Sequence, residues 1–266
     1  MEDFDQTLFC LTFFATQTLG IILVILTGYW RGVFHDGFGW QGDALKQFNW
    51  HPFLLTIGLV FLYGNGMLIY RVFRNAPKKV LKIFHASIML TSFIFMVIAL
   101  KAVFDSNNYN EDKNGKPDPL PHMKTLHSWM GIMTATLFTM QWVTGYVMFL
   151  APIAISSWIK SFYLSIHNWF GLFIFILACS TVLLGVAEEN IYKGFDMRNG
   201  PEGYMMNITS LLVIVFCGLV IFLSLNVKYK RLPLPEESYQ KISEPKLDAC
   251  QTSDQIKIDK PSGEEK

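Results

Sequence analysis

Charged residues are scarce in this sequence, and the shortage is uneven along the chain. Only 16% of the 266 residues are Asp, Glu, Lys or Arg, whereas a soluble domain usually carries about 25%. Hydrophobic residues make up 52% of the chain, and they gather into long stretches separated by short polar ones. This pattern excludes an ordinary soluble domain and predicts an integral membrane protein.

Two further classes of protein are disfavoured by what is missing. No run of basic residues is present and the net charge is +1, so we expect no nucleic-acid partner. The four cysteines give no disulfide framework, because three lie in apolar stretches and Cys250 lies in the polar C-terminal region.

Six apolar stretches are each long enough to cross roughly 30 Å of hydrocarbon as a helix. They run approximately over residues 8–30, 51–70, 83–104, 126–150, 162–187 and 205–226. The first follows an acidic segment, unlike the positively charged start of a signal peptide, so we interpret it as a retained helix. The predicted fold is therefore an all-α, integral membrane six-helix bundle.

The polar ends complete the predicted domain organisation. Residues 1–7 form a short N-terminal segment, and residues 8–227 form the transmembrane domain. Residues 228–266 are rich in Lys, Glu, Ser and Pro, which is typical of a disordered tail. Within this tail, Tyr239-Gln240-Lys241-Ile242 resembles a tyrosine-based sorting signal, and the sequence leaves its use open.

The orientation follows from Lys and Arg in short loops, because positive loops stay on the cytoplasmic side. The segment 71–82 holds five positive residues and no acidic one. Segment 105–124 has a net charge of 3 − 4 = −1, and segment 188–204 has a net charge of 2 − 4 = −2. We therefore predict that both termini, with segments 71–82 and 151–161, are cytoplasmic, and that the acidic loops face the outside or a lumen.

Four of the six histidines fall in predicted membrane helices: His51, His85, His127 and His167. Ionisable groups at membrane depth are costly and rare, so each is a candidate functional residue. A single imidazole could simply hydrogen-bond a neighbouring helix. Four imidazoles in four separate helices, with almost no acidic residue at membrane depth, point instead to a bound cofactor.

The positions of these histidines predict how they pair. Each is expected within about five residues of the N-terminal end of its helix. Because consecutive helices run in opposite directions, His51 and His127 would share the outer half of the membrane, and His85 and His167 the inner half. Two histidines at equal depth on facing helices are what bis-histidine haem ligation requires. No Cys-x-x-Cys-His motif is present, so we predict two non-covalent b haems within helices two to five.

Small residues lie on the same helical faces as the histidines. Gly131 and Gly171 follow a histidine by four residues, and Gly58 and Ser92 follow one by seven. They would leave room beside a porphyrin, although glycine in membrane helices also promotes close helix packing.

Two other functions could also place histidines in membrane helices. A histidine-based metal or proton transporter without haem would also place imidazoles in the membrane, but such sites usually mix histidine with Asp or Glu in the same core. A di-haem quinol-oxidising subunit commonly places two histidines on one helix about four turns apart, and no predicted helix here carries such a pair.

Four motifs together resemble the cytochrome b561 family of ascorbate-dependent transmembrane reductases, especially the animal members of chromaffin granules and the duodenum. They are FNWHP at Phe48–Pro52, YRVFRN at Tyr70–Asn75, TLHSWMG at Thr125–Gly131 and PEG at Pro201–Gly203, within a resemblance over about residues 15–232. The four histidines fall where the family's haem ligands fall. The resemblance implies ascorbate oxidation at the cytoplasmic haem and reduction of monodehydroascorbate or a ferric chelate at the outer haem.

The resemblance also assigns residues around the two haems. It implies ascorbate binding by Lys78, Lys82 and Lys160, and haem edges at Arg71, Lys78, His122, Thr125 and Glu188. Ascorbate is an anion near neutral pH, so the cation-rich loop would attract it. At Lys160 the family usually has arginine, and lysine keeps the charge but not the two-pronged guanidinium.

Several points stay open at this level. His122 could touch an outer haem propionate, bind the incoming iron, or be an ordinary loop residue. The sequence does not name the acceptor. We expect a homodimer in the lipid bilayer of the plasma membrane or of a secretory or endolysosomal vesicle.

Overall fold

The computed structural model describes residues 2–40, 42–192 and 200–234. Residues 1–230 cluster as one compact unit, and of the second unit, 231–266, the described residues are 231–234. Most of the predicted tail, including Cys250 and the sorting-like motif at Tyr239, therefore lies outside the described residues, as do Lys193 and Arg198 of the acidic loop.

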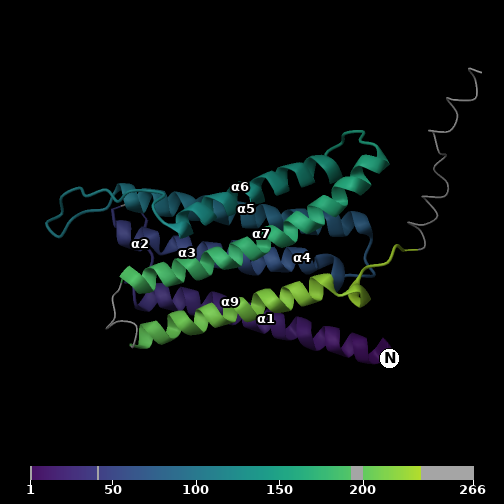
Figure 1. Cartoon of the computed structure of the whole chain (residues 1–266), viewed down its shortest axis with the longest axis horizontal. Coiled ribbons are helices and arrows are strands. Elements are labelled where there is room, and N and C mark those ends of the chain that lie inside the picture. The colour runs from purple at the N-terminus through teal and green to yellow at the C-terminus, as the bar shows by residue number, and fades with distance from the viewer. Residues whose placement is uncertain (1, 41, 193–199, 235–266) are drawn as a thin grey trace, which may run out of the picture. The chain divides into compact units, whose positions relative to one another are not determined.

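The described part of the chain is helical throughout its length, apart from connecting loops (Figure 1). The helices are α1 (Glu2–Val33), α2 (Ala44–Phe48), α3 (Trp50–Leu55), the π-helix η1 (Thr56–Leu62), α4 (Tyr63–Val72), α5 (Lys78–Asn108), α6 (Leu126–Phe149), α7 (Ser157–Tyr192), α9 (Pro201–Leu225) and the short 3₁₀ helix η2 (Val227–Tyr229).

Five segments are long and apolar enough to cross a membrane: Phe4–Val33, Ala44–Val72, Lys78–Asn108, Ser157–Tyr192 and Pro201–Leu225. The remaining predicted span is α6, a 24-residue helix without a charged side chain. Its threonines, Gln141 and His127 lower its hydropathy, and it packs along α7. The predicted all-α membrane bundle is confirmed.

The helices extend further than the apolar stretches that predicted them. Helix α1 already begins at Glu2 and α7 runs to Tyr192, because a helix continues past the hydrocarbon into polar residues. As a result, His85 lies seven residues (85 − 78) and His167 ten residues (167 − 157) after the start of its helix. The expected limit of about five residues is wrong for these two histidines.

The four histidine-bearing segments form the centre of the bundle. Helix α5 packs against the α2–α4 segment, and α6 packs against α7. Helix α1 runs along α9, and α9 also contacts α4 and α7, so the first and last helices cover one side of the central four (Figure 1). This arrangement places each histidine helix beside another histidine helix.

Many hydroxyl side chains in the bundle donate to a backbone carbonyl of their own helix. Thr27 donates to the carbonyl oxygen of Leu23 (2.9 Å), and Thr134 donates to that of Met130 (2.7 Å). Such bonds to the preceding turn let hydroxyl groups enter an apolar environment. Large apolar side chains such as Phe14 (67% exposed) and Leu211 (62% exposed) point outward, as expected for a surface that meets lipid.

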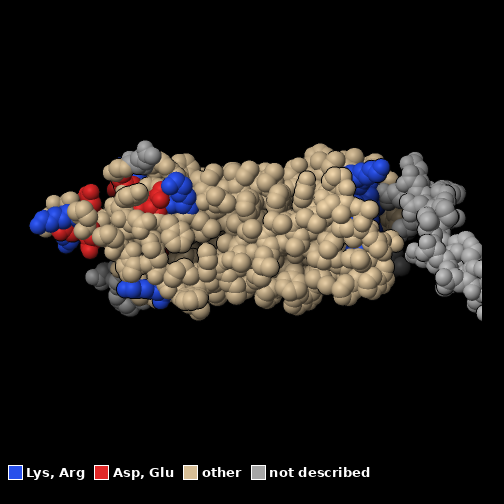
Figure 2. Space-filling view, turned by 90° about the horizontal axis from the view of Figure 1, so that it is seen from above, with Lys and Arg blue, Asp and Glu red and all other residues tan. Residues whose placement is uncertain are grey.

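On the face shown in Figure 2, charged residues gather at the two ends of the bundle, and the zone between them shows no charged residues. We call the end formed by residues 34–43, 105–125, 188–192 and 200–202 the acidic end, and the end formed by residues 71–82 and 150–160 the basic end. At the acidic end Asp112 accepts hydrogen bonds from the backbone N–H groups of Asn114 (2.8 Å) and Lys116 (2.9 Å). These hydrogen bonds from Lys116 and Asn114 hold the pKa of Asp112 below its ordinary value. Because they join residues two and four positions apart, the segment is a polar turn.

Candidate functional site

The four membrane histidines form two pairs in the structure. The ring centres of His51 and His127 lie 6.2 Å apart, and those of His85 and His167 also lie 6.2 Å apart. The planes within each pair are steeply inclined, at 89° and 72°. The predicted partners are therefore neighbours, the first pair toward the acidic end and the second toward the basic end.

The spacing within each pair fits an iron ion between two imidazoles. A metal–nitrogen bond is about 2 Å long, so two imidazoles on opposite sides of one metal have ring centres roughly 6 Å apart. The residues present thus fit bis-histidine ligation at both positions. The ligand assignment itself stays a prediction.

Hydrogen bonds hold three of the four rings in a defined orientation. Nδ1 of His51 lies 3.2 Å from the carbonyl oxygen of Ala99, Nδ1 of His85 lies 2.8 Å from that of Gly66, and Nδ1 of His127 lies 2.9 Å from that of Thr181. A carbonyl oxygen can only accept, so each Nδ1 carries the proton and Nε2 keeps its lone pair for a metal. Nδ1 of His167 is buried without a hydrogen-bond partner among the described residues.

Glycines allow neighbouring helices to approach the rings closely. A Cβ atom at Gly185 of α7 would lie 2.8 Å from Cε1 of His127, and one at Gly145 of α6 would lie 2.9 Å from Cε1 of His167. By contrast, a Cβ atom at Gly58 would lie 3.2 Å from the backbone oxygen of Ser92 on α5. Gly58 and Ser92 therefore bring two helices together, and the sequence pattern did not single out Gly145 and Gly185.

The two pairs lie at different depths in the bundle. Helix α7 carries His167 of one pair. It also carries Thr181, whose carbonyl oxygen bonds His127 and therefore marks the depth of the other pair. Fourteen residues (181 − 167) of helix correspond to about 21 Å. Tyr63 packs against Phe138 (5.1 Å) and Phe175 (5.6 Å) between these levels, so aromatic rings fill the bundle between the two histidine pairs.

The predicted ascorbate-binding lysines come together at the basic end. Lys78 and Lys82 lie in the first turns of α5, and Lys160 lies in the first turn of α7. The pKa of Lys82 is lowered by partial burial and by the positive charges of Lys78 and Lys160. Aromatic rings line the nearby histidine pair: Tyr70 lies 6.0 Å from His85, and Tyr163 lies 5.9 Å from His167.

Arg71 is engaged with the end of α9. Its guanidinium donates to the carbonyl oxygens of Asn226 (2.7 Å) and Ser224. These carbonyls belong to the last turn of α9 and the residue after it, where a helix offers unpaired acceptors. The structure thus gives Arg71 a capping role, alongside its predicted role at a haem edge.

The other predicted haem-edge residues lie at the acidic end. Thr125 caps α6 by accepting from the backbone N–H of Ser128 (3.2 Å). His122 contacts the side chains of Asn107 (3.4 Å) and Asn108 (2.9 Å) through its two ring nitrogens. Glu188 is half-buried on α7.

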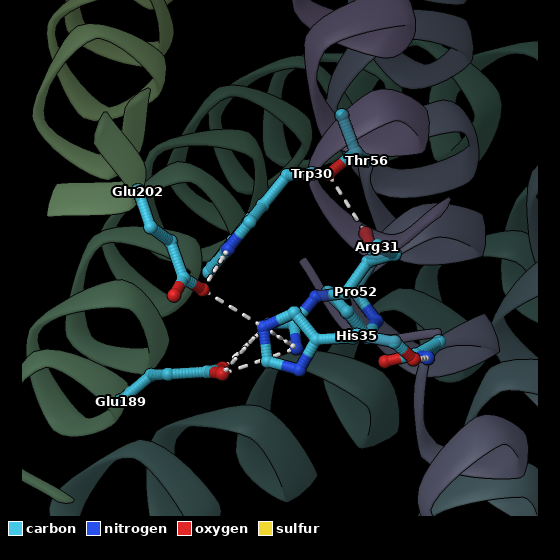
Figure 3. A network of polar contacts seen from close by, with 8 residues as sticks. Trp30, Arg31, His35, Pro52, Thr56, Glu189 and Glu202 are labelled. Carbon is cyan, nitrogen blue, oxygen red and sulfur yellow. Dashed lines mark hydrogen bonds and ion pairs between the residues drawn. The ribbon is translucent and has the colours of Figure 1, made fainter. Parts of the chain in front are cut away.

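A buried polar network at the acidic end was missed by the sequence analysis (Figure 3). Arg31 of α1 forms two hydrogen bonds with Glu189 of α7, at 3.1 and 2.5 Å. Nε2 of His35 lies 3.3 Å from Glu189 and 3.0 Å from Glu202 of α9. The indole of Trp30 donates to the same oxygen of Glu202 at 2.8 Å. The one signal for this network was Arg31, a charged residue at the end of an apolar helix.

Comparison with known proteins finds a matching family and similar sequences. The family model for eukaryotic cytochrome b561 matches residues 50–193, which include all four membrane histidines. Human transmembrane ascorbate-dependent reductase CYB561 is 38% identical over 224 residues, covering 84% of this chain and 85% of the human protein.

Two further relatives extend the comparison. The bovine lysosomal membrane ascorbate-dependent ferrireductase CYB561A3 is 36% identical over 247 residues, covering 89% of this chain and 87% of that protein. A Caenorhabditis elegans homologue of transmembrane ascorbate-dependent reductase CYB561 is 36% identical over 240 residues, covering 89% of this chain and 90% of that protein.

Proposed function

Because the chain belongs to the eukaryotic cytochrome b561 family, we propose that it is an ascorbate-dependent transmembrane reductase. It takes electrons from ascorbate at the basic end of the bundle and delivers them to an acceptor at the acidic end. The proposed acceptor is monodehydroascorbate or a ferric chelate; the name of the bovine relative, a ferrireductase, supports the ferric chelate.

The observation that carries this proposal is the presence of two imidazole pairs at two depths. His51 with His127, and His85 with His167, would each hold one b haem, with ring centres 6.2 Å apart in both pairs. These haems, when bound, supply reversible one-electron chemistry of iron. The pairs are separated along α7 by about 21 Å, so two sites together reach from one side of the hydrocarbon toward the other.

The chain's own residues support electron transfer in two ways. Carbonyl oxygens of Ala99, Gly66 and Thr181 orient three of the imidazoles, which favours one fixed ligand geometry. The rings of Tyr63, Phe138 and Phe175 fill the space between the two levels, which excludes water from the path.

The basic end suits an anionic electron donor. Helices α5 and α7 both begin there, and helix N-termini carry unpaired N–H groups and a partial positive charge. Lys78, Lys82 and Lys160 add full charges beside these N-termini. Together they would attract ascorbate and hold its oxygens close to His85 and His167.

The charge distribution supports the proposed orientation. The basic end faces the cytoplasm under the positive-inside rule, and the acidic end faces the outside or a lumen. The proposed location is the plasma membrane or a secretory or endolysosomal membrane, with the chain as a homodimer; the bovine relative is named as a lysosomal membrane protein.

A histidine-based metal or proton transporter is less well supported. In the described residues the hydrogen-bond partners of His51, His85 and His127 are backbone carbonyls. Each carbonyl accepts from Nδ1–H and leaves the Nε2 lone pair directed elsewhere, whereas a proton relay needs neighbouring groups that take up and release protons, which a backbone carbonyl does not do.

Removing one histidine at a time tests the proposal. The purified wild type should contain two haems per chain by the pyridine haemochrome assay and show a sharp α-band when ascorbate is added. His51→Ala or His127→Ala should reduce the content to about one and leave the site of His85 and His167 reducible by ascorbate. His85→Ala or His167→Ala should do the converse. A colourless wild type, or a single variant that keeps two haems, would refute the assignment.

A further inference from the structure

Gln141 is a polar side chain within the apolar stretch of α6. Its Nε2 donates to the backbone carbonyl oxygen of His167 on α7 at 2.6 Å. A carbonyl oxygen has two lone pairs, so it can accept this bond as well as the bond from its own helix. An amide in hydrocarbon must find its partner within the protein. The bond therefore ties α6 to α7 at the position of a candidate haem ligand.

Two successive turns of α6 meet His167. Gln141 contacts its backbone, and Gly145 lies four residues (145 − 141) further along the same helical face, beside its ring. A Cβ atom at Gly145 would be 2.9 Å from Cε1 and 3.4 Å from Nδ1 of His167. With the ring this close to α6, the distance between the two helices decides where the imidazole lies. Gln141 sets that distance at the same residue.

The ring of His167 lacks the hydrogen bond that the other candidate ligands have. Nδ1 of His51, of His85 and of His127 each lies 3.2 Å or less from a backbone carbonyl oxygen. Nδ1 of His167 is buried with no hydrogen-bond partner among the described residues. At this ligand a neighbouring helix holds the main chain instead of the ring.

A second side chain holds the next turn of α7. The hydroxyl group of Tyr63 on α4 donates to the backbone carbonyl oxygen of Gly171 at 2.8 Å, four residues (171 − 167) after His167. A Cβ atom at Gly171 would lie 3.5 Å from Nε2 of Gln141, so the two hydrogen bonds act on adjoining turns. Side chains from α4 and α6 thus fix the same part of α7.

From these contacts we propose that Gln141 is the positioning residue of His167: its amide fixes the α7 backbone, and thereby the place of the imidazole in the His85–His167 pair. This inference rests on the proposed function, which assigns a haem to that pair. The two ring planes are inclined at 72°. Movement of α7 against α6 would change this angle and the distance between the rings, and with them the geometry offered to an iron ion.

Electron paramagnetic resonance of the oxidised, haem-loaded full-length protein tests the inference, because the g values of low-spin ferric haem depend on the angle between its imidazole planes. His85→Ala and His127→Ala first assign one signal to each pair. Gln141→Met keeps the side-chain length and removes the donor. It should shift the largest g value of the His85–His167 haem and leave the His51–His127 signal unchanged. The shifted haem should pass to apomyoglobin about threefold faster, the effect expected when a side-chain hydrogen bond between membrane helices is lost.

Gln17→Met is the matched control. Gln17 is also a glutamine in an apolar helix, and its Nε2 has no hydrogen-bond partner in the part of the chain that the structure describes. This variant should keep both signals and the wild-type rate of haem loss.

Three results would overturn the inference: Gln141→Met keeps both signals and the wild-type rate, both signals change together, or Gln17→Met shows an equal shift. In each case the wild type still binds two haems, so the proposed function stands. A wild type without a signal from the His85–His167 pair would refute the proposed function and the inference with it.

Discussion

At the scale of single residues, the account depends on which ring nitrogen of each histidine carries the proton. Three backbone carbonyls settle this for His51, His85 and His127. His167 differs, because its Nδ1 has no hydrogen-bond partner among the described residues and its ring is instead surrounded by Phe149 at 5.6 Å and Tyr163 at 5.9 Å. Aromatic packing therefore replaces a hydrogen bond in orienting this ring.

Lys160 gives a prediction at this scale. An ammonium can pair with one anionic oxygen of ascorbate, whereas a guanidinium can grip two oxygens in one plane. Lys160→Arg should therefore lower the ascorbate concentration for half-maximal reduction by up to roughly fivefold, and Lys160→Ala should raise it. Stopped-flow reduction across an ascorbate series measures the effect. Identical curves for lysine, arginine and alanine would place residue 160 outside the ascorbate site.

Single residues also show what the sequence could and could not predict. The four histidines were found because an imidazole in an apolar helix is conspicuous by itself. Glu189 and Glu202 were not found, because each sits at the polar end of its helix, where acidic residues are ordinary. Their significance comes only from Arg31 and His35, which lie more than 150 residues away in sequence.

At the scale of helices, close packing positions the candidate ligands. A Cβ atom at Gly185 of α7 would lie 2.8 Å from Cε1 of His127, whereas a Cβ atom at Gly218 of α9 would meet nothing within 4 Å. Both glycines lie inside helices, so alanine at either position raises helix propensity by a similar amount, about 1 kcal/mol. Only the substitution at Gly185 forces a ring to move.

Gly185→Ala should therefore reduce the haem content at the His51–His127 site or shift its absorption band, while Gly218→Ala should leave both unchanged. Pyridine haemochrome content and the reduced spectrum measure this difference. Equal behaviour of the two variants would mean that contact with Gly185 does not position His127.

The first turns of α5 make a second prediction at this scale. Replacing Lys78 and Lys82 together by alanine should raise the ascorbate concentration for half-maximal reduction and leave the haem content unchanged. The difference from the wild type should shrink as salt is added, because charge attraction at the surface is screened over about 8–10 Å at physiological ionic strength. Replacing Lys113 and Lys116 together by alanine at the opposite end is a control with the same change in charge. If reduction kinetics are the same in the double variant and the wild type, the lysines only set the orientation of the chain in the membrane and do not bind ascorbate.

Helix boundaries were predicted less well than helix number. Hydropathy marks the part of a helix that lies in hydrocarbon, but α1, α5 and α7 continue into polar residues that fold as extra turns. The π-helix at Thr56–Leu62 was also missed. It follows α3, which contains Pro52, a residue with no N–H to donate. A Cβ atom at Gly58 would lie 3.2 Å from the backbone oxygen of Ser92 on α5, and such a contact between helices is not encoded in a local pattern.

At the scale of the whole molecule, the chemistry is divided between two ends. The basic end carries the lysines near His85 and His167, and the acidic end carries His35, Glu189 and Glu202 near His51 and His127 (Figures 1 and 2). The zone between them shows no charged residues on the face drawn in Figure 2. This division suits a protein that accepts electrons on one side of a membrane and delivers them on the other.

The central claim is tested most directly in sealed vesicles. Wild-type protein is reconstituted into liposomes that contain ascorbate, ascorbate oxidase removes any donor outside, and a ferric chelate with an impermeant Fe(II) indicator is added externally. We predict external Fe(II) formation that requires trapped ascorbate and is abolished in both His85→Ala and His127→Ala. External Fe(II) at the same rate in protein-free vesicles or in these variants, or none with the fully haem-loaded wild type, would contradict transmembrane electron transfer by this chain.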